Sequence, residues 1–138
     1  MSTAPAGVRM TVELKGLTCR LRHEPSATEW ITDPPKDNGG NASSFSPTDS
    51  VGAALLSCML TTMALAARRE SMPWGGATGS VEKIMVSNPR RIGELRIEIQ
   101  MPKEVRSEDR SKFEEIARGC PVARSLSPEL QMPVTFRY

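Results

Sequence analysis

Histidine is almost absent from this chain: His23 is the only one. A metal site built on several histidines is therefore excluded, and a histidine-dependent nucleophile would have to use His23. Aromatic residues make up only 4% of the chain, which argues against a surface that stacks nucleic-acid bases. The net charge is +2 and no long run of one charge sign occurs, so we expect neither nucleic acid nor a membrane as partner.

Cysteine is also scarce: the chain has three, Cys19, Cys58 and Cys120, and no two of them form a C-x-x-C pair. This spacing argues against a structural zinc site, and we expect no metal and no cofactor. The N-terminal residues MSTAPAGVRM lack the continuous apolar stretch of a signal peptide, which favours a cytoplasmic location. In that reducing compartment the cysteines are expected to be thiols rather than structural disulfides.

Long apolar segments are limited to one, from Ser50 to Ala67, which carries no charge and reaches the lower limit for crossing a bilayer. Serine and threonine interrupt it, so we interpret it as the buried core helix of a soluble protein. With 138 residues the chain can build one proper hydrophobic core but not two. We therefore expect a single domain that spans residues 1–138.

Periodicity and turn residues predict an α+β fold in the order β-β-β-α-β-β-α-α-β, with the long helix covered by sheet. For that helix, Ser46 is the expected N-cap, Pro47 the first residue and Asp49 a favourable acid in the first turn. Segment 33–47 is rich in proline, glycine, asparagine and serine, and is expected to be a loop without regular structure. The expected strands are 8–14, 17–21, 28–32, 81–87, 94–100 and 132–138. The expected helices are 47–69, 108–118 and 121–126, with Ser107 as the N-cap of the second.

Cys58 lies within the long helix, on a face that predicts burial. The other residues assigned to that face are Val51, Ala54, Leu55, Thr62 and Leu65. Most free cysteines are small core residues, and a reactive Cys58 would need a cation from elsewhere in the chain. Arg20 and Arg22 alternate along the second strand and share one face, so either is a candidate, although both also fit a solvated surface.

Cys120 lies between Gly119, which ends one helix, and Pro121, which can begin the next. We expect it at an N-cap, where free backbone amides favour a thiolate. The alternative interpretation is a cysteine that fills space in a linker. Cys19 has no basic neighbour on its own strand face and is expected to contribute to packing only.

Two segments resemble a known family. FSPTDSVGAALLSCMLTTMALAARR, preceded by DPPKDNGG, and the later ARGCPVARSLSP resemble the two cysteine motifs of the OsmC/Ohr family of thiol peroxidases. The resemblance extends from about Thr28 to Phe136. It implies an OsmC-like fold in an intertwined homodimer, with Cys58 as the peroxidatic thiol and Cys120 as the resolving thiol.

The resemblance also implies an organic hydroperoxide as substrate, an external dithiol reductant that is lipoyl-type in some members, and a role in oxidative or osmotic stress defence. In the hydroperoxide reductases an acidic residue orients a catalytic arginine; that position is Thr48 here, and Asp49 is one residue later. One residue turns a helix by about 100°, so Asp49 has a different geometry. The expected site is Cys58, Cys120, Arg20 and Asp49.

Alternatives remain open at the level of sequence. The departure at Thr48 and the indistinct arginine also fit an OsmC-like module that binds a small molecule or senses redox state without turnover. A purely structural Cys58–Cys120 disulfide conflicts with the expected cytoplasmic location. Met59 and Met63, together with Leu55, are interpreted either as an apolar wall for a bulky substrate or as core.

Overall fold

The structure is a computed structural model that describes residues 6–138. The expectation that the N-terminus is no signal peptide falls partly on residues 1–5, which lie outside the described residues. Two compact units are distinguished, one that ends at Ser50 and one that comprises Val51–Tyr138. The order of strands and α-helices is the one that the sequence predicts, so the α+β fold is confirmed. The single-domain assignment of residues 1–138 stays a prediction.

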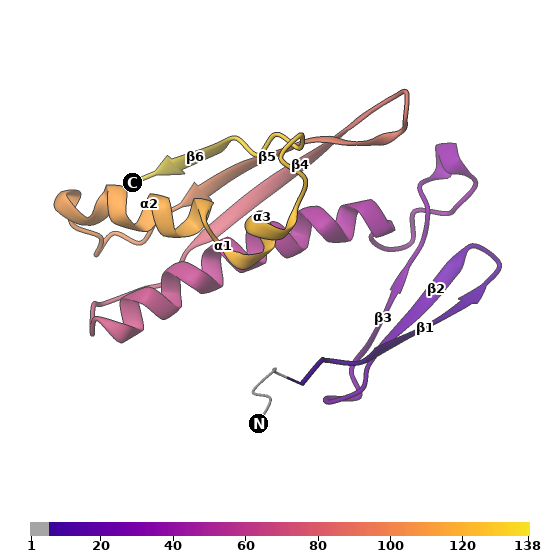
Figure 1. Cartoon of the computed structure of the whole chain (residues 1–138), viewed down its shortest axis with the longest axis horizontal. Helices are drawn as coiled ribbons and strands as arrows, with labels where there is room; N and C mark the ends of the chain where they lie inside the picture. Colours follow the sequence, from indigo (N-terminus) through magenta and orange to yellow (C-terminus); the bar gives the residue numbers. More distant parts are fainter. Residues whose placement is uncertain (1–5) are drawn as a thin grey trace. The chain divides into compact units, whose positions relative to one another are not determined.

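The first unit contains an antiparallel sheet of β1 (Met10–Lys15), β2 (Thr18–His23) and β3 (Glu29–Thr32), in that order (Figure 1). The turn between β1 and β2 is tight because Gly16 adopts a φ of 65°, in the left-handed region that glycine enters without steric cost. All three strands agree with the prediction to within two residues.

The two faces of this sheet differ in chemistry. The register pairs Val12 with Leu21 and Leu21 with Trp30, so apolar side chains share one face. On the other face Arg20 lies between Glu13 and Ile31. The apolar face is nevertheless accessible, since Val12 is 60% exposed and Trp30 is 46% exposed.

The loop after β3 is organised around a buried carboxylate. Asp33 is 3% exposed, and its Oδ2 accepts hydrogen bonds from the Asn41 N–H at 3.2 Å, the Ser43 N–H at 3.0 Å and the Ser43 hydroxyl at 2.7 Å. The loop also contains a short 3₁₀-helix, η1 (Lys36–Asn38), so the expectation of a segment without regular structure was wrong there. Gly39 permits it by closing η1 with a φ of 89°.

The long helix α1 (Pro47–Arg69) begins and ends where the sequence predicts. Its start is a reciprocal cap. Ser46 Oγ accepts a hydrogen bond from the Asp49 N–H at 3.1 Å, and Asp49 Oδ2 accepts one from the Ser46 N–H at 2.9 Å. Two backbone donors that the helix itself cannot satisfy are satisfied in this way.

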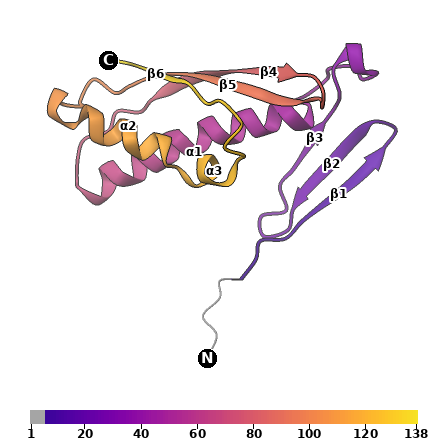
Figure 2. The ribbon, with the colours of Figure 1, turned by 45° about the horizontal axis from the view of Figure 1, so that its top comes forward.

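The second unit holds a sheet in the order β4 (Thr78–Val86), β5 (Arg91–Gln100), β6 (Val134–Arg137). β4 and β5 are antiparallel, as predicted, although both begin three residues earlier than expected, and β6 is parallel to β5. Helices α1, α2 (Arg110–Arg118) and α3 (Pro121–Ser125) lie on one side of this sheet (Figures 1 and 2).

The core of the second unit lies between this sheet and its helices. Its fully buried side chains come from α1, β5, α2 and the residue before α3, and they are Leu55, Met59, Met63, Ala67, Leu95, Ile97, Ile99, Phe113, Ala117 and Cys120. Met59 and Met63 are therefore core residues, and the interpretation of them as a substrate wall was wrong. By length and composition α1 could cross a membrane; in this structure it contributes buried residues to the core of an α+β fold.

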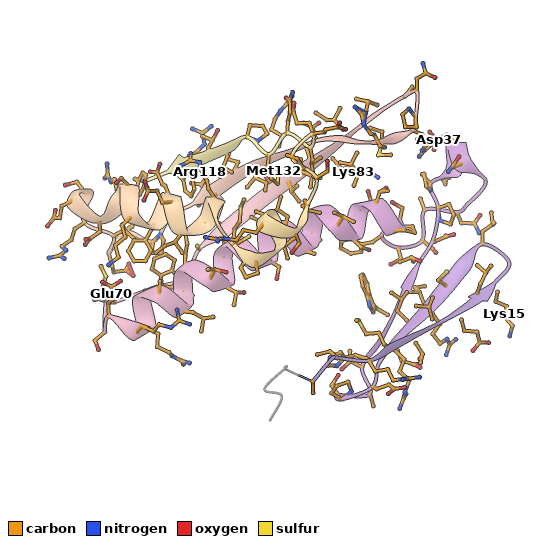
Figure 3. All side chains as sticks on the ribbon, viewed as in Figure 1. Lys15, Asp37, Glu70, Lys83, Arg118 and Met132 are labelled. Atoms are coloured by element: carbon orange, nitrogen blue, oxygen red, sulfur yellow. The ribbon has the colours of Figure 1, made fainter. Side chains whose placement is uncertain are left out.

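The start of α2 differs from the prediction. Ser107 is not its N-cap but the first residue of a 3₁₀ turn, η2 (Ser107–Asp109), and α2 starts at Arg110. Arg106 Nε donates to Asp109 Oδ2 at 2.9 Å, which fixes this turn ahead of the helix. Gly119 ends α2, as expected. Lys112 on α2 pairs with Glu70, which follows α1 and is labelled in Figure 3.

Candidate functional site

Cys58 lies on α1 at the edge of the helix's buried face rather than within it. The buried positions of α1 are Gly52, Leu55, Leu56, Met59, Met63 and Ala67, whereas Cys58 is half-buried. Leu65, which the sequence places on the same face, is 42% exposed. The expectation of a fully buried Cys58 was wrong, because the core side of the helix is turned by about one residue, or 100°, towards Met59.

Cys120 has the N-cap position of α3 that the sequence predicts. Its backbone is extended, with φ −63° and ψ 156°, and Pro121 follows at the start of the helix. Its side chain is fully buried. Burial raises the pKa of the Cys120 thiol, and the backbone N–H groups of Ala123 and Val122 lower it by less. The amides thus act as expected, but burial and the neighbouring Cys58 together outweigh them, and the thiol form is favoured.

The structure brings Cys58 and Cys120 together, and both are free thiols. Their side chains are hydrogen-bonded to each other, and both this bond and negative charge on Cys58 raise the pKa of Cys120 further. The thiol form of Cys120 is therefore favoured beside Cys58. In such an arrangement an oxidant from solvent can oxidise the half-buried Cys58 sulfur, and the buried Cys120 thiol can then react with the oxidised sulfur.

Thr62 is a neighbour of Cys58 to which sequence reasoning assigned no role. Its Oγ1 lies 3.8 Å from Cys58 Sγ, one helical turn further along α1. The signal was present in the sequence, because residues four apart on a helix are neighbours on its surface. A hydroxyl beside a candidate nucleophile can donate a hydrogen bond to the thiolate.

Arg124 holds the turn that carries Cys120. Its Nε donates to the carbonyl oxygen of Gly119 at 2.6 Å, while its backbone N–H donates to the carbonyl of Cys120 at 3.0 Å. These bonds connect the end of α2 to the first turn of α3. Sequence analysis missed this residue because the contact depends on how the two helices meet.

Arg20 and Arg22 share a face of the first unit's sheet, as predicted. Arg20 Nη1 lies 3.8 Å from Glu29 Oε1, and Arg22 Nη1 lies 3.7 Å from Glu29 Oε2. Both guanidinium groups are accessible to solvent. Arg20 also lines a groove of about 550 Å³ on this face, together with Glu13, Lys15, Thr18, Glu29 and Ile31.

Asp49 lies in the first turn of α1, where its carboxylate accepts a hydrogen bond from the Ser46 N–H. Its observed function is therefore helix capping, in addition to any role towards an arginine. Cys19 is half-buried on β2, with Leu14 and Thr32 as its cross-strand neighbours. In the described part of the chain, no group of three histidine, cysteine or acidic side chains is arranged to hold a metal ion.

Comparisons with known proteins agree on one family. The model of the family described as OsmC-like protein matches residues 39–135. A solved structure from Psychrobacter arcticus 273-4, described as an osmotic stress induced and detoxification response protein, is 34% identical, with a TM-score of 0.90 over 99% of this chain and 100% of its own. A search of curated proteins finds no match.

Two more distant structures share the fold alone. An organic hydroperoxide resistance protein from Legionella pneumophila is 10% identical, with a TM-score of 0.80 over 99% of this chain and 100% of its own. An OsmC-like protein of unknown function from Vibrio cholerae is 12% identical, with a TM-score of 0.80 over 94% of this chain and 99% of its own. The fold is therefore found both in a protein named for organic hydroperoxide resistance and in one described as of unknown function.

Proposed function

This chain belongs to the OsmC-like protein family, and from that premise we propose that it is a thiol-dependent peroxidase that reduces organic hydroperoxides. The observation that carries the proposal is the hydrogen bond between the side chains of Cys58 and Cys120, one half-buried and the other buried with a raised pKa. One protein of the same fold is named for organic hydroperoxide resistance. The proposed setting is oxidative or osmotic stress defence in the cytoplasm.

The proposed oxidation of the protein by one hydroperoxide has two steps. The Cys58 thiolate attacks the outer oxygen of the hydroperoxide, an S–O bond forms, and the O–O bond breaks. The alkoxide that leaves takes up from solvent the proton that Cys58 lost on ionising, and becomes the alcohol. Cys58 is then a sulfenic acid. The Cys120 sulfur attacks the Cys58 sulfur, its proton joins the leaving hydroxide as water, and a disulfide forms. The raised pKa of Cys120 keeps that proton available.

Reduction of the disulfide closes the cycle. An external dithiol, of the lipoyl type in our proposal, gives two electrons and two protons, and becomes a disulfide as Cys58 and Cys120 return to thiols. Arg20 is proposed to stabilise the Cys58 thiolate and the charge on the leaving oxygen, with Arg22 as the alternative. Asp49 is proposed to orient that arginine. The accessible guanidinium groups on β2 support these assignments.

The active form is proposed to be a homodimer. Support comes from the apolar face of the β1–β2–β3 sheet, where Met10, Val12 and Leu14 are 64%, 60% and 65% exposed. Apolar side chains that are gathered on one face and left accessible are typical of an interaction surface.

The central test is peroxide consumption by the reduced protein. We expect it to consume cumene hydroperoxide in the presence of a dithiol, and to lose two thiols per chain when the dithiol is removed. Cys58→Ser should abolish consumption, whereas Cys120→Ser should allow one oxidation and then stall. Cys19→Ser is the matched control and should leave turnover unchanged. Retention of Cys58 and Cys120 as thiols after excess peroxide would contradict the proposal.

A second candidate function is a binding or redox-sensing module without turnover. Two observations favour it: Thr48 has the position of the family's acidic residue, and Asp49 is engaged in capping α1. The same experiment separates the two functions. A sensor would form the Cys58–Cys120 disulfide once, with no sustained peroxide consumption when dithiol is supplied.

A further inference from the structure

Thr62 is placed where its hydroxyl can act directly on the reacting sulfur. Its Oγ1 and Cys58 Sγ are 3.8 Å apart on successive turns of α1, a distance that suits a hydrogen bond to sulfur. Both side chains are half-buried, so water competes less for this contact than it would on an open surface. Since the two residues belong to one rigid helix, the spacing does not depend on the position of a loop.

The Thr62 hydroxyl lies within hydrogen-bond distance of a sulfur atom. A threonine inside a helix often bonds the carbonyl one turn earlier, which would leave the sulfur without this donor. Within residues 6–138 the Thr62 hydroxyl has a single hydrogen-bonding partner, and it is Cys58 Sγ. The donor can therefore be aimed at the sulfur whenever that sulfur carries negative charge.

We propose that Thr62 is a further residue of the site, and that its hydroxyl donates a hydrogen bond to the Cys58 thiolate, which stabilises the thiolate and fixes the direction of its sulfur. The bond is stronger to the thiolate than to the neutral thiol because it becomes charge-assisted. Thr62 and Cys120 then act as two donors that converge on Cys58 Sγ. The remaining lone pair is left to attack the peroxide.

This inference rests on the proposed function only for its catalytic consequence, because the hydrogen bond itself can be tested without peroxide. Three variants isolate it. Thr62→Val keeps the shape and removes the hydroxyl, Thr62→Ser keeps the hydroxyl, and Thr61→Val removes a neighbouring exposed hydroxyl. None of them changes a charge, so Cys120 and every other titratable group around Cys58 is the same in all four proteins.

The readout is the rate at which iodoacetamide alkylates Cys58 in the full chain between pH 6 and about 10, a range that brackets the reference thiol, with the site identified by mass spectrometry. For Thr62→Val we expect a rate about five- to tenfold lower at neutral pH, converging with wild type at high pH where all the sulfur is ionised. Thr62→Ser should restore most of the rate, and Thr61→Val should match wild type. Far-UV circular dichroism checks that α1 is intact.

Two results would overturn the proposal: equal alkylation profiles for Thr62→Val and Thr61→Val, or a slow profile for Thr62→Ser. If Thr62→Val misfolds, the alkylation rate of Thr62→Ser is the deciding measurement. A lower rate in a folded Thr62→Ser contradicts the role of the hydroxyl. Peroxide consumption is measured in parallel. If alkylation is slower in Thr62→Val but the wild type consumes no peroxide, the peroxidase function is refuted and the role of Thr62 is supported. If the wild type consumes peroxide but alkylation is unchanged in Thr62→Val, only the role of Thr62 is refuted.

Discussion

Asp33 is a single side chain on which the conformation of a loop depends. Three donors from Asn41 and Ser43 converge on one carboxylate oxygen, and these bonds, with the Ser43 hydroxyl as the largest contribution, lower the pKa of Asp33. We predict that Asp33→Asn lowers the melting temperature at neutral pH, because an amide oxygen accepts these bonds less strongly than a carboxylate. Asp37→Asn, on the exposed part of the same loop, is the control.

The pH dependence of this effect has a definite sign. A pKa that is lower in the folded state than in the unfolded state contributes stability above the unfolded value, and that contribution disappears as the pH falls through the folded value. The difference in melting temperature between wild type and Asp33→Asn should therefore shrink below pH 3.8, the ordinary value for this carboxyl. A constant difference down to acid pH would show that the ionised form has no special role.

Single residues also show where sequence reasoning stops. The cap residue Ser46 and the helix-start proline after Cys120 were predictable, because they depend on neighbours in the chain. The partial exposure of Cys58 was not, since the side of α1 that faces the core is decided by packing on β5. Contact between Cys58 and Cys120 was expected only through family resemblance, because residues so distant in sequence meet through the tertiary fold.

At the scale of elements, the cap of α1 allows two roles of Asp49 to be separated. Ser46→Ala removes the hydroxyl that accepts from the Asp49 N–H, and we expect a loss of about 1 kcal/mol in the free energy of unfolding. Urea denaturation measures it. The exposed Ser57 in the middle of α1 provides the matched change, and Ser57→Ala should stay within about 0.5 kcal/mol of wild type.

Asp49→Asn completes this comparison. The asparagine can still accept a hydrogen bond from the Ser46 N–H, so most of the cap is kept while the charge is lost. If Asp49 orients the catalytic arginine as proposed, this variant should lose peroxide turnover with little loss of stability. Turnover equal to that of wild type would leave Asp49 with the capping role alone.

The strands of the second unit show which element boundaries cannot be predicted from the sequence. β4 begins at Thr78 rather than Val81 because Thr78 and Gly79 pair with the end of β5, although they lack apolar alternation. Gly79 is needed there, since a Cβ would lie 2.8 Å from the carbonyl oxygen of Glu98. The parallel pairing of β6 with β5 also has no local signal, because it joins segments separated by two helices.

At the scale of the whole molecule, the exposed apolar face of the β1–β2–β3 sheet is the proposed homodimer interface. Val12 lies on that face and is 60% exposed, whereas Thr11 lies on the opposite face of the same strand. Val12→Asp would bury a charge in the proposed interface, and we expect the dimer dissociation constant to rise at least about tenfold, equivalent to about 1.4 kcal/mol. Thr11→Asp adds the same charge outside that face and should leave the constant unchanged.

Analytical ultracentrifugation over a range of protein concentrations distinguishes these outcomes. A wild-type chain that sediments as a monomer throughout the micromolar range would contradict the dimer. Equal effects of Val12→Asp and Thr11→Asp would instead remove the apolar face from the interface. Peroxide turnover of the Val12→Asp variant is then measured as a function of the dimer fraction. If turnover falls with the dimer fraction while Cys58 can still be alkylated, the active site requires groups from both copies of the chain.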